Sequence, residues 1–378
     1  MHVLELPVEL LQCIGRFCSI VSSRRDTLSI ALSCSRMYKV LEPIIWHSVT
    51  CISSAHVRKL YSALSERPSL AKNIIHLKFS QNWLWTGCAY GTSATTLACK
   101  EFCRVLEFCG ARLLSLDWAC MCDTIKIHPS VNSTILNLTG LTTLCLEDIV
   151  FEPEDTKPYP NLSKYFYAPL KVFRLRRFRF IGSHPFDLIE RCQSTLESVE
   201  LVWGAILENV DRRSWPNVTV LSIYNGSYHL ATLQRAFPNV RALAYGLCNP
   251  LDGNLISAPG WPKLELIQLN KDSIPQKFPL QRRVDRLDIL RNPVVNSDSL
   301  AYFERAIKDF QPTVLKMSAE IHLVGQCLLL CLDRLPLLRI LHLNIRAPVL
   351  DRSFARNFVV CSQFSSFSTS AKSPMWIG

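Results

Sequence analysis

The chain has 378 residues, a formal net charge of +11, and 48% hydrophobic against 19% charged residues. This length exceeds one ordinary compact core, so we expect either two domains or an elongated repeat array. The hydrophobic fraction excludes general disorder, and 13 Gly against 21 Pro disfavours glycine-rich phosphate-binding loops. A positive excess indicates nucleic-acid binding only where it is concentrated in one patch.

The first helix is predicted directly after Leu6. Pro7 suits a first helical turn, and the carboxylate of Glu9 complements the positive end of the helix dipole. The apolar positions that follow recur at three- and four-residue spacing and form one stripe; they are Leu10, Leu11, Ile14, Phe17 and Cys18. Because Glu5, Pro7 and Glu9 interrupt the apolar run and no basic region precedes it, the stretch is not a standard signal peptide.

Two further helical segments are expected before residue 50. Asp26 can cap the second helix, and a third short turn is expected to stop at Pro43. The second helix places Leu28, Ala31, Leu32 and Ser35 on one side, and the third turn carries Tyr38 and Leu41. Such a bundle is too short to bury all of its apolar residues, so a partner or the following domain must cover part of Leu6, Pro7, Ile14 and Trp46.

Three landmarks stand in order in this region. They read Leu6-Pro7-x-Glu9-Leu10-Leu11-x-x-Ile14, then Leu28-x-x-Ala31-Leu32-Ser33-Cys34-Ser35-Arg36-x-Tyr38, then Leu41-x-Pro43-x-x-Trp46-x-x-Val49. Over about residues 3 to 50 the chain resembles an F-box, in the form common in fungal F-box proteins. A plain helical cap on a repeat domain is the alternative.

The resemblance implies a partner rather than a reaction. F-box modules bind the Skp-type adaptor, and through it the cullin, of an SCF-type cullin-RING E3 ubiquitin ligase, using the Leu-Pro turn and the apolar helix faces. The adaptor-binding residues implied here are Leu6, Pro7, Glu9, Leu10, Ile14, Leu32 and Trp46.

From residue 70 onward the pattern apolar-x-x-apolar-x-apolar returns eleven times. The middle apolar positions are 77, 116, 144, 173, 199, 221, 243, 267, 287, 317 and 341, at intervals of 20 to 39 residues. This spacing is typical of leucine-rich repeats, in which a short strand is followed by a helix or an irregular return. Segments 94–110 and 296–311 have helical spacing between two such strands. A doubly wound α/β domain is the alternative.

In this register, alternate strand residues point away from the core onto the concave face of a curved solenoid. The candidate substrate-binding residues are Lys78, Asp117, Glu147, Arg174, Arg176, Glu200, Tyr224, Gln268, Arg286, Asp288 and His342. Their signs are mixed and no regular aromatic platform accompanies them, which favours a protein-binding surface over a nucleic-acid groove. Arg174 and Arg176 lie in the densest basic stretch and suit either an acidic or phosphorylated segment or simple solvation.

Chemistry for catalysis or metal binding is not indicated. The 16 Cys are spread through the chain without two paired zinc knuckles, and buried inert thiols are the favoured interpretation. Spread in this way they also favour a cytoplasmic or nuclear protein. The longest uncharged apolar run, 321–332, is too short to cross a bilayer, so we expect no membrane partner. No catalytic motif appears, and no cofactor is expected.

The sequence therefore predicts an α/β repeat protein with a small helical module in front. The expected division is 1–50 for the F-box-like module, 51–69 for a connecting segment, 70–350 for the solenoid and 351–378 for a poorly patterned tail. The expected function is that of a substrate-recognition subunit of an SCF-type ligase, whose solenoid binds an unknown protein. The alternative is a leucine-rich-repeat scaffold that acts outside any ligase.

Overall fold

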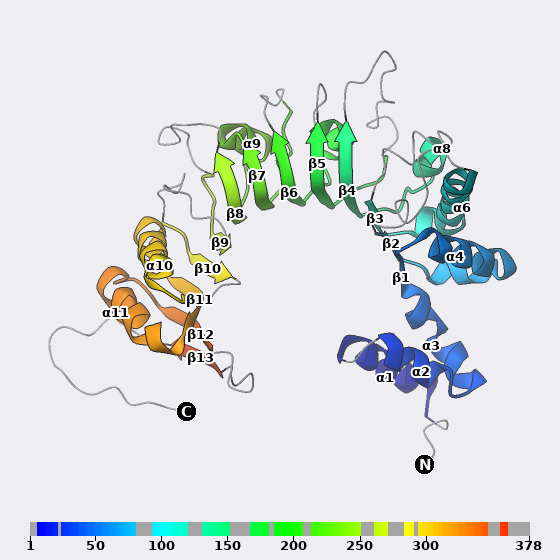
Figure 1. The fold of residues 1–378 in the computed structure, drawn as a ribbon, viewed down its shortest axis with the longest axis horizontal. Coiled ribbons are helices and arrows are strands. Elements are labelled where there is room, and N and C mark those ends of the chain that lie inside the picture. The colour runs from blue at the N-terminus through cyan, green and yellow to red at the C-terminus, as the bar shows by residue number, and fades with distance from the viewer. Residues whose placement is uncertain are drawn as a thin grey trace. The chain divides into compact units, whose positions relative to one another are not determined.

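The computed structural model describes eleven segments of the chain. They are residues 6–21, 24–80, 93–119, 131–151, 167–180, 185–206, 213–250, 261–270, 283–290, 294–346 and 356–361. Two compact units divide the chain, Met1–Ala205 and Ile206–Gly378. Figure 1 shows the order of their elements.

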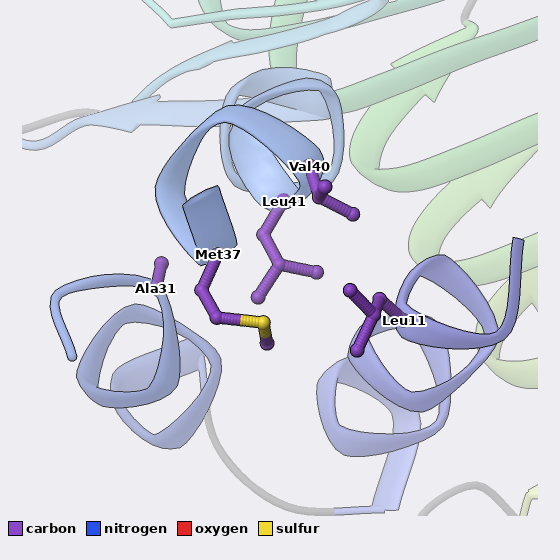
Figure 2. Packing of buried hydrophobic residues seen from close by; sticks show 5 residues of the cluster. All are labelled: Leu11, Ala31, Met37, Val40 and Leu41. Atoms are coloured by element: carbon purple, nitrogen blue, oxygen red, sulfur yellow. The ribbon is translucent and has the colours of Figure 1, made fainter. Parts of the chain in front are cut away.

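Three helices open the first unit: α1 (Val8–Val21), α2 (Arg24–Ala31) and α3 (Ser35–His47). The helix predicted after Pro7 is confirmed, because the Leu11 amide donates to the Pro7 carbonyl at 3.1 Å. The three helices share one small core in which buried side chains from each of them point toward one another (Figure 2). Its members are Leu11 from α1, Ala31 from α2, and Met37, Val40 and Leu41 from α3.

Two predicted details of these helices are wrong. The helix α2 begins at Arg24, so Asp26 lies inside its first turn and does not cap it. The helix α3 does not stop at Pro43 but runs through it to His47. Burial of Val40 and Leu41 in the shared core favours the continued helix over the break that proline alone would cause. At its start, the Cys34 Sγ accepts a hydrogen bond from the Met37 amide at 3.4 Å.

The remainder of the first unit is a parallel sheet whose strands pair in chain order. The strands are β1 (Ser48–Cys51), β2 (His76–Phe79), β3 (Ser115–Ala119), β4 (Thr143–Phe151), β5 (Val172–Phe180) and β6 (Ser198–Ile206). The connections hold α4 (Ser54–Glu66), η2 (Pro68–Asn73), α6 (Ser93–Cys109), η3 (Gly110–Arg112), α8 (Val131–Leu136) and η5 (Pro185–Cys192). The helix α6 covers the sheet through an aromatic cluster of Phe79, Phe102 and Trp118.

The second unit repeats the same plan. Its strands are β7 (Val220–Tyr228), β8 (Ala242–Pro250), β9 (Leu266–Asn270), β10 (Arg286–Leu290), β11 (Val314–Glu320), β12 (Ile340–Arg346) and β13 (Arg356–Cys361). Pairing is parallel where the register is described from β7 to β12, and β13 lies antiparallel to β12. The connections hold α9 (Leu230–Ala236), α10 (Ser297–Phe310), η7 (Ile321–Leu323) and α11 (Val324–Arg334). Parallel strands in chain order with helical returns are typical of a leucine-rich-repeat solenoid.

The predicted register is confirmed at ten of the eleven central positions. Leu77, Leu116, Leu144, Phe173 and Val199 pair in one row of the first unit, and the second unit continues the pattern from Leu221 to Leu341. The exception is β11, where Leu315 and not Met317 pairs with Leu287. Pro312, three residues before Leu315, is buried and takes the first apolar position of this repeat.

The helices predicted at 94–110 and 296–311 are confirmed as α6 and α10. Asn296 caps α10, since its side chain accepts from the Ser299 amide at 2.9 Å.

The sheet begins earlier and ends later than predicted. Val49 of β1 pairs with Leu77, so a first repeat begins with β1 and continues into α4. The segment 51–69, predicted to be a connection, is therefore mostly part of this repeat. Val49 and Cys51 supply the two later apolar positions of that repeat, and Trp46 supplies the first. Within 351–378, residues Arg356–Cys361 form β13, and the rest of that range lies outside the described residues.

Candidate functional site: two surfaces of the first unit

The helices α1 and α2 expose a second apolar face besides the one that they bury. On α1, Leu11 is 0% exposed whereas Leu10 is 50% exposed; at the end of α2, Ala31 is buried whereas the next residue, Leu32, is 69% exposed. The exposed set, called the apolar helix face below, consists of Leu10, Ile14 and Phe17 on α1, Leu28 on α2, and Leu32 directly after α2. Large exposed apolar side chains on neighbouring helices are typical of a protein contact.

Gly15 decides which side of α1 faces the core. A Cβ atom at this position would overlap the side chain of Leu41, so α1 and α3 approach each other most closely there. Leu11 and Gly15 lie on one side of the helix, and Leu10, Ile14 and Phe17 point elsewhere. The predicted single stripe is therefore two faces, of which only one is buried.

The predicted adaptor-binding residues fall into two groups. Pro7, Glu9, Leu10, Ile14 and Leu32 are all exposed. Leu6 is partly buried against the helical core. Trp46 is half-buried at the first apolar position of the first repeat, where the sheet needs it independently of any partner.

The second surface is the polar face of the sheet in the first unit, built from the strand residues between the buried positions. Parallel register brings Lys78, Asp117, Arg174 and Glu200 into one row, with Cys145 between Asp117 and Arg174. Glu147 and Arg176 lie in the next row. The structure thus brings together all six candidate substrate-binding residues of this unit.

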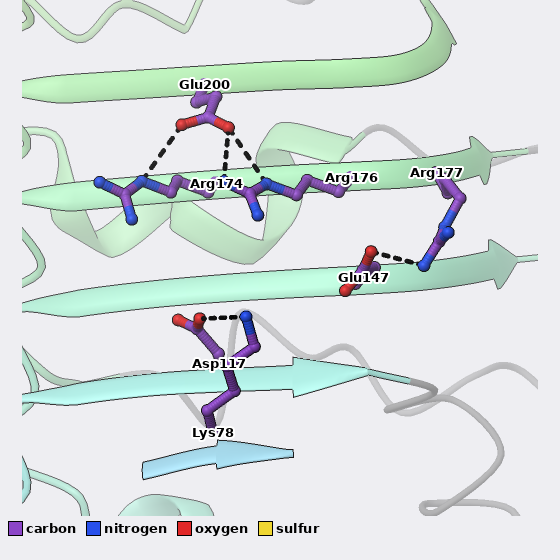
Figure 3. A network of polar contacts seen from close by, with 7 residues as sticks. All are labelled: Lys78, Asp117, Glu147, Arg174, Arg176, Arg177 and Glu200. Carbon is purple, nitrogen blue, oxygen red and sulfur yellow. Dashed lines mark hydrogen bonds and ion pairs between the residues drawn. The ribbon is translucent and has the colours of Figure 1, made fainter. Parts of the chain in front are cut away.

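Charged side chains on this face pair across neighbouring strands (Figure 3). Lys78 reaches Asp117 at 3.8 Å, and Arg174 and Arg176 both reach Glu200, at 3.2 and 2.9 Å. In addition Arg177, which was not among the candidates, turns to β4 and pairs with Glu147 and Asp148. Every member of these ion pairs is at least one-fifth exposed, so each pair contributes little stability on its own.

The five candidates of the second unit lie on its own sheet. Gln268, Asp288 and His342 share one row, and Tyr224 and Arg286 lie in the rows to either side. Asp288 corrects the prediction, because it is 2% exposed and does not present its carboxylate to solvent. The guanidinium group of Arg286 makes a bidentate contact with that carboxylate, with Nε–Oδ1 and Nη2–Oδ2 distances of 2.7 and 2.9 Å.

Sequence periodicity missed Trp203. Val199 and Leu201 are buried on β6, so strict alternation would place the Trp203 indole in the core as well. Instead the backbone at Trp203 has φ of +58°, and the side chain is 61% exposed. Asp148 and Arg177 occupy the matching positions on β4 and β5 with φ of +54° and +49°. A left-handed backbone at a bulky residue is uncommon, and sequence alternation carries no signal for it.

The buried thiols are not reactive groups. Burial, with smaller contributions from neighbouring thiols and acidic groups, raises the pKa of Cys103, Cys109 and Cys145 to about 12. They therefore stay protonated near neutral pH and are poor nucleophiles and ligands. Among the described residues, no three His, Cys, Asp or Glu side chains gather as a metal ion requires. Cys120 and Cys122 lie outside the described residues.

None of the helices in the described segments combines the length and the hydropathy that a membrane span requires.

Comparison with known proteins adds distant structural similarity. No family model matches the chain, and no curated protein matches it. Among solved structures, the leucine-rich repeat-containing protein LegL7 from Legionella pneumophila is similar at 15% sequence identity, over 71% of this chain and 82% of that chain, with a TM-score of 0.37. A similarity at this score is too low to assign the fold, which is defined instead by the strand order and register given above.

Proposed function

We propose that this chain is the substrate-recognition subunit of an SCF-type cullin-RING E3 ubiquitin ligase. In this proposal the apolar helix face binds a Skp-type adaptor, which connects the chain to the cullin. The repeat sheets bind a protein that the ligase then marks for degradation. The chain contributes binding, and its partners contribute catalysis.

The single observation that carries the proposal is the apolar helix face. Its exposed side chains lie on α1, on α2 and directly after α2, while Leu11 and Ala31 of the same two helices are buried in the helical core, so the module presents large apolar groups without unfolding. Leu10, Ile14 and Leu32 are also positions at which the F-box resemblance implies adaptor contact. In the isolated chain these apolar side chains stay in contact with water, which is unfavourable. A partner that covers them removes this surface from water, and the free energy gained favours binding.

The polar sheet face supports the second half of the proposal. It combines mixed charges, half-buried ion pairs and an exposed indole on neighbouring strands. A surface of this composition is typical of protein contacts, in which Trp and Arg contribute disproportionately to affinity.

Calorimetric titration of the full chain with a purified Skp-type adaptor tests the proposal. The variant Leu10→Ser/Leu32→Ser removes two exposed members of the apolar helix face and leaves the buried Leu11 in place. We expect at least about tenfold weaker binding, because truncated apolar anchors commonly cost about 1–4 kcal/mol. Leu6 is a poorer choice, since it packs against the helical core and its loss would also affect folding.

Leu329→Ser/Leu332→Ser is the matched control. Both leucines are exposed on α11 in the second unit, so this variant changes apolar surface by a similar amount at another place. It should bind the adaptor as the parent chain does. Absence of adaptor binding by the parent chain, or equal weakening by both variants, would contradict the proposal and favour a repeat scaffold outside any ligase.

A further inference from the structure

Arg174, Arg176 and Glu200 form a compact group with a surplus of one positive charge. The Glu200 carboxylate receives Nε of Arg174 at 3.2 Å on one oxygen, and Nε and Nη2 of Arg176 at 3.1 and 2.9 Å on the other. One carboxylate cannot accept all the N–H donors of two guanidinium groups. Both arginine side chains are more than one-third exposed, so a ligand can reach them.

The neighbouring charges do not cancel this surplus at the same place. Arg177 turns away from Glu200 toward Glu147 on β4 (Figure 3), and it also pairs with Asp148. On this face β5 therefore carries three arginines, whereas β4 carries Glu147 and Asp148 and β6 carries Glu200. Arg174 lies opposite the neutral thiol of Cys145 on β4, so an acidic group is attracted to this part of β5.

Trp203 lies beside the positive group on the same strand as Glu200. The two residues are three positions apart, which corresponds to about 10 Å along a strand. The left-handed backbone turns the indole outward, and the next residue, Gly204, has no side chain and lies directly against the Phe178 ring. The same backbone conformation recurs at Asp148, Arg177 and Asn225, so it belongs to the repeat, and at Trp203 it exposes a large aromatic side chain.

We propose that this face, defined by Arg174, Arg176, Glu200 and Trp203, binds an extended protein segment that carries an Asp or Glu carboxylate and a large apolar side chain about 10 Å apart. The carboxylate lies between the two guanidinium groups, and the apolar side chain stacks on the indole. This inference rests on the proposed function in that it describes what the ligase subunit would recognise.

The ligand group is a carboxylate and not a phosphate because of the charge count. Two arginines and Glu200 leave one positive charge, which one carboxylate neutralises. A phosphorylated residue carries about −1.5 to −2 charges near neutral pH and would leave an excess of negative charge beside Glu200. The same carboxylate of Glu200 would repel it.

Selection from a library of random twelve-residue peptides, on the immobilised full chain, tests the proposal without a known substrate. We expect enrichment of Asp or Glu two to four positions from Phe, Tyr, Trp, Leu or Ile. A fluorescent synthetic copy of the most enriched peptide then gives affinities by anisotropy. A second copy with phosphoserine in place of the acidic residue compares the two anions.

Three variants separate the parts of the site. Trp203→Asn keeps a residue that tolerates the left-handed backbone, and should weaken the peptide about tenfold or more. Arg174→Gln/Arg176→Gln/Glu200→Gln removes the three charges together, so that none of them is left without its partner, and should abolish the preference for an acidic residue. Glu200→Gln alone raises the surplus to two positive charges and should tighten binding about two- to fivefold.

Several outcomes would overturn the inference. They are a library without enrichment, enrichment of basic residues, an affinity that Trp203→Asn leaves unchanged, or weaker binding by Glu200→Gln. A phosphoserine copy that binds more than about tenfold tighter would assign the site to phosphate. Adaptor titration of the parent chain distinguishes the two proposals, because normal adaptor binding without any enriched peptide contradicts this inference alone. Unchanged thermal unfolding of each variant shows that it is folded.

Discussion

At the scale of single residues, one contact between side chains changes the pKa of a histidine. It joins His47, the last residue of α3, to His76 on β2. Their rings lie edge to face with centroids 4.9 Å apart. Burial, and after it the positive charge of His47, lowers the pKa of His76, which Asp117 only partly offsets. The folded chain therefore binds a proton at His76 less readily than the unfolded chain does.

The sign of this shift predicts acid sensitivity. Since the pKa of His76 is lower in the folded than in the unfolded state, the folded state is favoured fully above about pH 6.5 and loses stability as the pH falls below it. The variant His76→Gln, which cannot titrate, should lose less thermal stability than the parent chain between pH 7.5 and pH 5.5. Thermal unfolding followed by circular dichroism measures this, and an equal loss in both proteins would show that His76 does not contribute.

At the scale of elements, sequence spacing predicts a helix well and its orientation poorly. The start of α1 after Pro7 follows from local chemistry, and so does the cap of α10 at Asn296. The buried side of α1 depends on Gly15, because the absence of a side chain there lets Leu41 of α3 approach. The spacing of apolar residues within α1 does not predict this contact. Trp203 is a second case, because its outward direction comes from one backbone angle at a position where alternation predicts burial.

The two faces of α1 should respond differently to the same substitution. Leu11→Ala removes a fully buried side chain from the helical core and should lower the free energy of unfolding by about 2–5 kcal/mol. Leu10→Ala, one residue away and half exposed, should change it by less than about 0.5 kcal/mol.

Unfolding of the helical module is best followed by amide hydrogen exchange within α1 and α3, because the two units of the chain need not unfold together. Similar losses of protection in Leu10→Ala and Leu11→Ala would contradict the assigned orientation of α1.

At the scale of the whole molecule, the repeat was predictable because its signal recurs. Each strand carries the same apolar spacing, and buried residues such as Leu116, Leu144 and Phe173 pair in the register that this spacing predicts. The ends of the array were not predictable in the same way. The first repeat uses Trp46 and Val49, which were predicted to lie in the helical module, and Cys51, which was predicted to lie in the connecting segment; at the other end β13 reverses direction.

The candidate sites were likewise predictable only in part. Periodicity identified which residues share the polar sheet face, because side-chain direction in a strand has a fixed period. It could not identify which charges neutralise one another, since Arg174 and Arg176 lie 26 and 24 positions before Glu200 and meet it only when the chain folds back into the next strand. Nor could it show that Asp288 is enclosed by Arg286.

The central claim, that the apolar helix face is the adaptor-binding surface, is tested most directly by the reactivity of Cys13. This thiol is exposed on α1, beside the exposed residues Leu10, Ile14 and Phe17, whereas Cys103 and Cys331 are buried. Alkylation by iodoacetamide, quantified for each cysteine by mass spectrometry, is compared with and without a saturating Skp-type adaptor. The account predicts that the adaptor slows alkylation of Cys13 by at least about tenfold and leaves the buried thiols unreactive in both samples. An adaptor that binds while Cys13 reacts at its original rate, or one that does not bind at all, would contradict the account.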